Sequence, residues 1–237
     1  MSQSDSMAQR FVEQIRPILE RRDNQALAAT LDGEWPHDQL VAFLDPRHPD
    51  AVKVALICLA LTGQAGDEPR IVPLLHDDDA ATVAYAEYAL WSIWFRSCPD
   101  PEAVEALNAA IHLIGEDCLA AAVEQLDALI ARSPDFAEVY NQRAIAFYLQ
   151  GDYEQAIADC RQTLQLNPCH FGAWAGLGHC YVTCERLEEA LDAYTNALRI
   201  HPRLEGIRQT TLYLQECLHL RQTPDSPRAW PPSESAA

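Results

Sequence analysis

Apolar residues recur every three or four positions along most of the chain, which is the spacing of one face of an α-helix. The segment GDYEQAIADCRQTLQLNP, at 151–168, shows the pattern: Ile157 and Leu164 fall on one face, and a proline closes the segment. Proline cannot donate to a helix ladder, and it disfavours helical geometry in the residue before it. The pattern predicts a helix over 153–166, preceded by another over 137–150.

The same segment recurs at a shift of 34 residues in both directions. Residues 185–202 repeat it downstream and residues 117–134 repeat it upstream, each copy ending in proline. The preceding segments also match, so that Tyr140 aligns with Trp174. A fixed period of this length is typical of stacked helix pairs, each of which buries its apolar face against the next.

These residues resemble the tetratricopeptide repeat, whose pattern is W-x2-L-G-x2-Y…A-x3-F…P. The second copy departs from the pattern at Arg143, where a leucine is expected, and the first copy has Ala106 in place of the first aromatic residue. The third copy matches best, through Trp174, Leu177, Gly178, Tyr181, Ala190, Tyr194, Ala197 and Pro202.

A second period, of 31 residues, relates segment 40–61 to segment 71–92. Each of these segments reads as a short helix, a loop rich in aspartate, and a longer alanine-rich helix. They resemble the short bacterial type of HEAT repeat. The basic residue of that pattern is present as Lys53 in the first unit and is replaced by Ala84 in the second.

The two resemblances imply an all-α fold, a right-handed helical-repeat solenoid in which one kind of helix pair runs into the other. We expect helices at about 6–21 and 24–31, and a joint between the halves at 96–101. The expected regions are an N-terminal helical cap at 1–35, HEAT-like repeats at 36–98, and three tetratricopeptide units with a capping helix at 99–220. The units lie at about 103–136, 137–170 and 171–204, the capping helix lies at 206–220, and a disordered proline-rich tail follows at 221–237.

The charge and composition of the chain exclude some classes of binding partner and favour others. Acidic residues outnumber basic ones 35 to 17, which gives a net charge of −18 and argues against nucleic-acid and anionic-membrane binding. The same charge favours a partner with a basic patch. No membrane-spanning run or signal-peptide pattern is visible, so we expect a cytoplasmic protein. The eight cysteines are expected to be free thiols, because that compartment is reducing.

Catalytic motifs are missing from the sequence, so we expect no enzyme activity and no cofactor. His179, Cys180 and Cys184, with Cys169 nearby, suggest a zinc site as one alternative, but Cys180 fits a small buried slot of the repeat. The aspartates at 77–79 suit either a hard cation or a helix cap, and we favour the cap.

Trp91, Trp94 and Phe95 lie at helical spacing near the joint between the halves. Such a stripe is either an exposed binding patch or core, and we favour core that holds the two halves together.

The resemblance places a binding site in the concave groove that the first helix of each unit lines. The corresponding residues are Leu107, Ile111, Asn141, Ile145, Tyr148, Ala175, His179 and Val182. Leu107, Ile111 and Gly172 stand where chaperone-binding relatives need Lys or Asn for a terminal carboxylate, so an apolar peptide or amphipathic helix fits better. Alternatively, the chain's own C-terminal helix or N-terminal half covers part of this groove.

We therefore expect a non-catalytic adaptor or scaffold for a protein or peptide partner. One alternative is a regulatory accessory subunit that self-associates as a homo-oligomer through the tryptophan-rich seam. The other is a metal-binding protein that uses the Cys/His cluster at 169–184.

Overall fold

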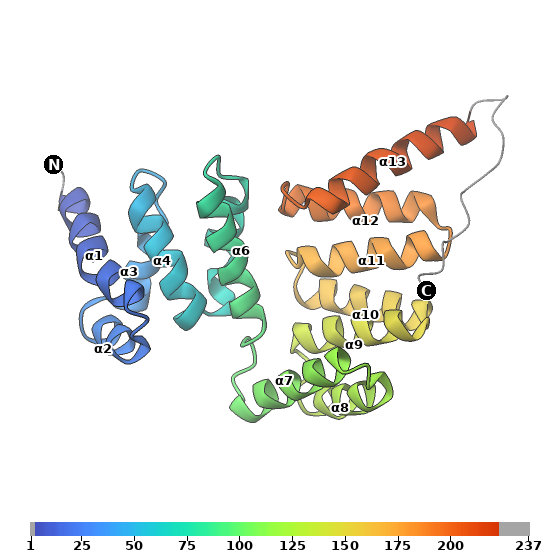
Figure 1. Cartoon of the computed structure of the whole chain (residues 1–237), viewed down its shortest axis with the longest axis horizontal. Coiled ribbons are helices and arrows are strands. Elements are labelled where there is room, and N and C mark those ends of the chain that lie inside the picture. Colours follow the sequence, from blue (N-terminus) through green and yellow to red (C-terminus); the bar gives the residue numbers. More distant parts are fainter. Residues whose placement is uncertain (1–2, 223–237) are drawn as a thin grey trace.

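The computed structural model describes residues 3–222, which fold into α-helices and two short 3-10 helices, with no strand among them (Figure 1). The helices stack side by side as a solenoid, so the all-α fold expected from the sequence is confirmed. Most of the tail expected to be disordered, 223–237, lies outside the described residues. Positions 221 and 222 instead belong to the last helix.

The N-terminal half contains the first six α-helices (Figure 1). They are α1 (Gln3–Glu20), α2 (Asn24–Glu34), α3 (His37–Ala42), α4 (Pro49–Thr62), α5 (Glu68–Ile71) and α6 (Ala80–Trp94), with 3-10 turns at Ala65–Asp67 and Val72–His76. The two helices expected at the N-terminus are present as α1 and α2. The first of them, α1, packs on the end of α3, where Phe11 stacks on Phe43 with ring centroids 4.4 Å apart.

The HEAT-like interpretation of this half stays a prediction. The first expected unit contains the helix pair α3 and α4, but the first helix of the second unit is broken into α5 and the following 3-10 turn. Pro69 and Pro73 stand at the starts of those two short segments. Because proline lacks a backbone donor, each proline is best placed at the start of a new helical turn.

The aspartates at 77–79 cap α6. The side chain of Asp79 accepts from the backbone N–H of Ala81 at 3.2 Å and from Lys53 at 3.0 Å. Asp77 accepts in turn from the backbone N–H of Asp79 at 2.8 Å. The free N–H groups of a helix start are thereby satisfied, so the capping interpretation of these residues is confirmed.

The C-terminal half is a stack of helix pairs followed by one further helix. The members are α7 (Pro101–Gly115), α8 (Leu119–Arg132), α9 (Ala137–Gln150), α10 (Tyr153–Leu166), α11 (Phe171–Thr183), α12 (Leu187–Ile200) and α13 (Glu205–Gln222). Each helix packs against the next along the chain. The bounds of α9 and α10 agree with the sequence prediction, and α13 covers the last pair with Leu214 fully buried, as expected of a capping helix.

Arg143, the departure from the repeat pattern, joins three helices. It donates two hydrogen bonds from α9 to Asp159 on α10, both at 2.7 Å, and a third to Asp127 on α8. These bonds raise the pKa of the guanidinium, chiefly through Asp159. An ion-paired arginine therefore fills a slot that Leu177 fills in the next unit, where the packing is apolar.

The N-terminal half packs against one edge of the repeat stack through α6, which lies alongside the start of α11 and the end of α12 (Figure 1). Trp94 stacks on His170 at 4.3 Å between ring centroids and contacts Phe171. Phe171 and Ile200 are buried in the same core cluster as the N-terminal helices. Trp94 is therefore core between the halves, as expected of the stripe, and Trp91 packs against this core while only partly buried.

Polar contacts complete this junction. His201 is buried and pairs with Glu87 at 3.2 Å, and Arg203 donates to the backbone carbonyls of Asp77 and Asp78. Trp94 is only 2% exposed, so it cannot contact a second copy of the chain. The homo-oligomer alternative required such a contact at this seam.

Candidate binding pocket in the repeat groove

A pocket of about 180 Å³ lies between α9 and α11, the first helices of two successive pairs. Its wall is largely apolar and is formed by Trp91, Asn141, Ala144, Ile145, Tyr148, Leu149, Cys160, Gly172, Gly176, His179 and Cys180. A dry apolar cavity of about 150 Å³ is large enough to bind benzene. The pocket therefore has room for one large apolar side chain.

The outer wall of the pocket is a stripe on α9. Ile145, Tyr148 and Leu149 are three or four residues apart, so they share one face of the helix, and they are 40%, 37% and 54% exposed. Large apolar side chains with this much exposure, gathered at the mouth of a pocket, are typical of a binding surface.

One end of the pocket is closed by the N-terminal half. Trp91 of α6 packs on the first turn of α11 so closely that a Cβ on Gly172 would lie 2.6 Å from its ring. Only glycine permits that approach. At this end of the pocket the N-terminal half therefore covers part of the groove, which is one of the alternatives left open by the sequence.

Two thiols lie at the floor of the pocket. Cys160 comes from α10 and Cys180 from α11, and both are almost completely buried. The interaction between the two thiols lowers the pKa of Cys180 and raises that of Cys160. Burial adds to the rise at Cys160.

His179 stands between this pocket and a neighbouring, more open one of about 470 Å³ that also includes Glu87, His201 and Arg203. Its Nδ1 lies 2.8 Å from the hydroxyl of Tyr194. Burial lowers the pKa of His179 and raises that of Tyr194, so the neutral imidazole accepts from the neutral phenol. The Nε2–H of this tautomer is left as a hydrogen-bond donor in the groove.

A buried polar cluster supports the start of α9 beneath the pocket. Glu138 is fully buried and accepts from Asn141 at 2.9 Å, from Gln142 at 2.7 Å and from His170 at 2.9 Å. His170 also accepts the backbone N–H of Ala173 through Nδ1, which fixes the Nε2–H tautomer. Asn141 lines the pocket with its amide engaged in this cluster.

The structure brings together four of the eight groove residues predicted from the sequence: Asn141, Ile145, Tyr148 and His179. The remaining four do not line the pocket. Leu107 is fully buried in the core of α7 and α8, where no partner can contact it, and Ile111 packs against the same core. Ala175 is half-buried, and Val182 packs against the core around α12.

Sequence reasoning missed Trp91, Cys160 and Gly176 as pocket residues. The sequence pattern assigned Trp91 only to the junction between the halves. Trp91 also lines the pocket, because Gly172 has no side chain and lets the indole ring pack on the start of α11. Cys160 belongs to a second helix of its unit, whereas only first helices were expected to line the groove.

The metal-site alternative finds no support in the described residues, because no group of three or more His, Cys, Asp or Glu lies where it could hold an ion. Cys180 sits at a packing position, as the repeat pattern indicated. Among residues 3–222, moreover, no helix has both the length and the apolarity needed to cross a membrane.

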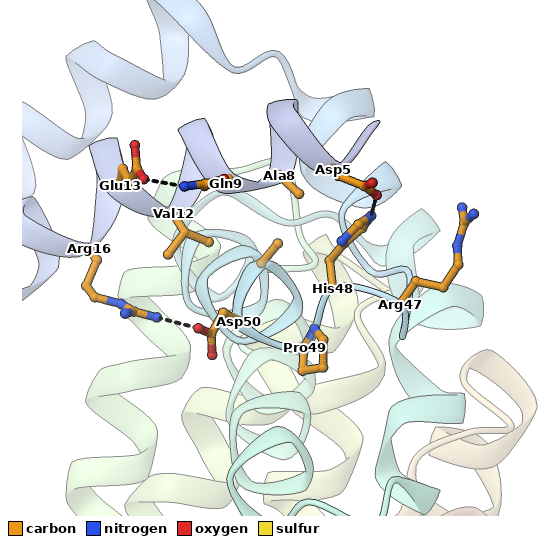
Figure 2. A pocket seen from close by; sticks show the side chains of 11 residues that line it. Asp5, Ala8, Gln9, Val12, Glu13, Arg16, Arg47, His48, Pro49 and Asp50 are labelled. Atoms are coloured by element: carbon orange, nitrogen blue, oxygen red, sulfur yellow. Dashed lines mark hydrogen bonds and ion pairs between the residues drawn. The ribbon is translucent and has the colours of Figure 1, made fainter. Parts of the chain in front are cut away.

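A third and larger pocket, of about 620 Å³, lies between α1 and the start of α4 (Figure 2). Two of its acidic side chains already have partners. Arg16 lies 3.3 Å from Asp50, and His48 lies 3.5 Å from Asp5. Since these side chains already have partners, the groove between α9 and α11 is the stronger candidate.

Comparison with known proteins identifies the repeats. Family models described as tetratricopeptide repeat match residues 137–168 and 171–203. A TPR repeat-containing protein of Rhizobium etli is 36% identical over 81 residues, which is 31% of this chain and 40% of that protein. The protein SGT1 homolog of Homo sapiens is 35% identical over 88 residues, which is 37% of this chain and 24% of that protein. The alignments thus span less than half of either relative.

Among solved structures, the Sgt2 TPR domain from Aspergillus fumigatus is similar, with a TM-score of 0.51 and 16% sequence identity. The similarity covers 59% of this chain and 93% of that domain, and at this identity it shows the fold alone. Together with the family matches, it shows that this all-helical chain contains tetratricopeptide repeats, two of which, at 137–168 and 171–203, contribute α9 and α11 to the pocket.

Proposed function

We propose that this protein is a non-catalytic adaptor that binds a short peptide segment of a partner protein in the pocket between α9 and α11. The partner inserts one large apolar side chain as its anchor. The observation that supports this most strongly is the pocket itself, whose volume of about 180 Å³ and apolar wall suit one such side chain.

The charges favour a peptide with basic residues beside the anchor. The chain carries a net charge of −18, which attracts cationic partners over distances of about 8 Å at physiological salt. No lysine or arginine lines the pocket, so a terminal carboxylate finds no cation there. His179 offers a neutral N–H instead, which suits a backbone carbonyl of the peptide.

The closed end limits the length of peptide that fits. Trp91 packs on the start of α11, so an extended peptide cannot run along the groove past this point. The peptide must end, turn or leave the groove beside Trp91. We therefore propose a short linear motif as the ligand. The eight thiols, all free, fit an adaptor that works in the reducing cytoplasm.

Selection of binders from a displayed library of random peptides tests this function. We expect the selected sequences to share one Phe, Leu, Trp or Met flanked by Lys or Arg. Replacing Ile145 by Glu puts a charge at the pocket mouth and should weaken binding of these peptides, measured by fluorescence anisotropy, at least tenfold. That loss corresponds to about 1.4 kcal/mol.

Leu212→Glu is the matched control. Leu212 is 62% exposed on α13, outside the pocket, so the same change in charge and size there should leave affinity nearly unchanged. Peptides that bind the Ile145→Glu variant as tightly as the wild type would overturn the assignment of the pocket.

A further inference from the structure

The paired thiols at the pocket floor are not needed to bind an apolar side chain. Cys160 and Cys180 come from successive repeats, one on α10 and the other on α11. The Cys160 sulfur lies 3.4 Å from where a Cβ of Gly176 would stand, and Cys180 is one helical turn further along the same face of α11. Cys160 and Cys180 therefore line the same pocket from the two sides of the boundary between the repeats.

We propose that Cys160 and Cys180 form a redox-active dithiol, which a peroxide oxidises to a disulfide that cross-links α10 to α11 at the floor of the groove. This inference goes beyond the proposed function and does not depend on it. The pocket gives a small oxidant access to both sulfurs, although the residues themselves are hardly exposed.

The two thiols differ in how readily they ionise. The interaction with the Cys160 thiol lowers the pKa of Cys180, which makes Cys180 the better source of thiolate. Cys180 attacks one peroxide oxygen, the O–O bond breaks, and the departing hydroxide takes a proton to become water. Cys180 is then a sulfenic acid.

The second step closes the disulfide. Cys160 attacks the Cys180 sulfur, the S–O bond breaks, and the hydroxyl leaves as a second water with the proton of the Cys160 thiol. In sum, two thiols and one hydrogen peroxide give one disulfide and two waters, and two electrons pass from sulfur to peroxide. A dithiol reductant reverses the change by thiol–disulfide exchange.

Oxidation also changes the pocket. A disulfide holds its sulfurs about 2.05 Å apart with a fixed dihedral preference, so both side chains must turn toward each other. The pocket floor is then reshaped and the two repeats are tied together. Conversely, an anchor side chain in the pocket shields both thiols from peroxide, so occupation and oxidation oppose each other.

Peptide mapping of the full chain tests the proposal. Reduced protein is treated with hydrogen peroxide, alkylated with N-ethylmaleimide under denaturing conditions, digested without reductant and analysed by mass spectrometry. We expect a linked peptide pair that contains Cys160 and Cys180 and disappears on treatment with dithiothreitol. Cys118, which is exposed and distant in sequence, serves as the reference thiol in the same digest.

Two variants, each checked for wild-type helix content by circular dichroism, separate this chemistry from general oxidation. Cys160→Ser should abolish the linked pair and leave the Cys180 sulfenic acid open to trapping by dimedone. Cys118→Ser, the matched control, should retain the linked pair. The proposal is overturned if Cys160 and Cys180 are both recovered alkylated while Cys118 is oxidised, or if Cys180 pairs with a different cysteine.

Discussion

At the scale of single residues, the repeat depends on positions where no side chain fits. A Cβ on Gly178 would lie 2.3 Å from the ring of Tyr194, and Tyr194 is itself almost completely buried. The glycine of the repeat pattern is therefore explained by close helix approach. The hydroxyl of Tyr194 also hydrogen-bonds to His179 in the groove. The close contact between Gly178 and Tyr194 therefore helps to position His179 at the edge of the pocket.

Replacing Gly178 by Ala should lower the free energy of unfolding by about 1–3 kcal/mol, because the added methyl group overpacks the contact with Tyr194. The loss should appear although alanine favours a helix by about 1 kcal/mol over glycine. Gly206→Ala is the control, since no atom lies within 4 Å of its added Cβ. Urea denaturation measures both variants, and an unchanged or stabilised Gly178→Ala protein contradicts the packing role.

His179 should make stability depend on pH. Burial lowers its pKa from the ordinary value of 6.5, so below about pH 6.5 the unfolded state binds more protons than the folded state. Its contribution to the free energy of unfolding should therefore decline as the pH falls through this range. Denaturant titrations between about pH 7 and about pH 5 should show a shallower decline for His179→Gln. Parallel curves for the two proteins would contradict the assignment.

At the scale of elements, the period of 34 residues predicted the helix pairs well, because each pair repeats the same small and large residues in the same slots. The groove residues were harder to predict. Leu107, Asn141 and Ala175 share one slot, but in the structure Leu107 is fully buried, Asn141 lines the pocket and Ala175 is half-buried. Ile145 and His179 share the slot four residues later, which does face the pocket. Residues that share a slot in the repeat thus point in the same direction from their helices. How exposed each side chain is depends on the residues that pack over it.

The ion pair of Arg143 and Asp159 takes the place of an apolar pair. A shift of 34 residues aligns them with Leu177 and Ala193, which are both buried in the core around α12. Arg143→Leu alone should destabilise the protein by about 3–5 kcal/mol, because it leaves the carboxylate of Asp159 buried without its partner.

Adding Asp159→Ala to Arg143→Leu should restore stability to within about 1 kcal/mol of wild type, because the second unit then carries the apolar pair of the third. Thermal and urea unfolding of the two single variants and the double variant measure this coupling. Strictly additive losses would show that the two side chains do not act as a pair.

At the scale of the whole molecule, the core of the N-terminal half extends to two buried residues of the repeat stack, Phe171 and Ile200. The sequence indicated a joint at 96–101 and a tryptophan stripe beside it, but it could not show which surface α6 would cover. That surface is built from His170, Phe171 and Ile200, which are more than 75 residues away in sequence and carry no local pattern that points to α6. The wall that Trp91 adds to the pocket is a consequence of this docking.

Because the N-terminal core includes residues of the repeat stack, the full chain should unfold in a single cooperative transition. Trp94→Ala removes the stack on His170 and opens a cavity in the junction, which should cost about 3–5 kcal/mol. Urea unfolding of the wild-type and Trp94→Ala proteins, followed by tryptophan fluorescence and by circular dichroism, measures this loss of stability and shows how many transitions occur. Two separated transitions in the wild-type protein would mean that the halves fold independently.

The most direct test of a binding pocket shared by both halves is a titration of the isotope-labelled full chain with a selected peptide, followed at the tryptophan indole N–H signals by NMR. Trp91 lines the pocket, whereas Trp35 is buried in the N-terminal core. The Trp91 signal should shift in proportion to occupancy while that of Trp35 stays in place. A peptide that binds and leaves the Trp91 signal unchanged would contradict the shared pocket.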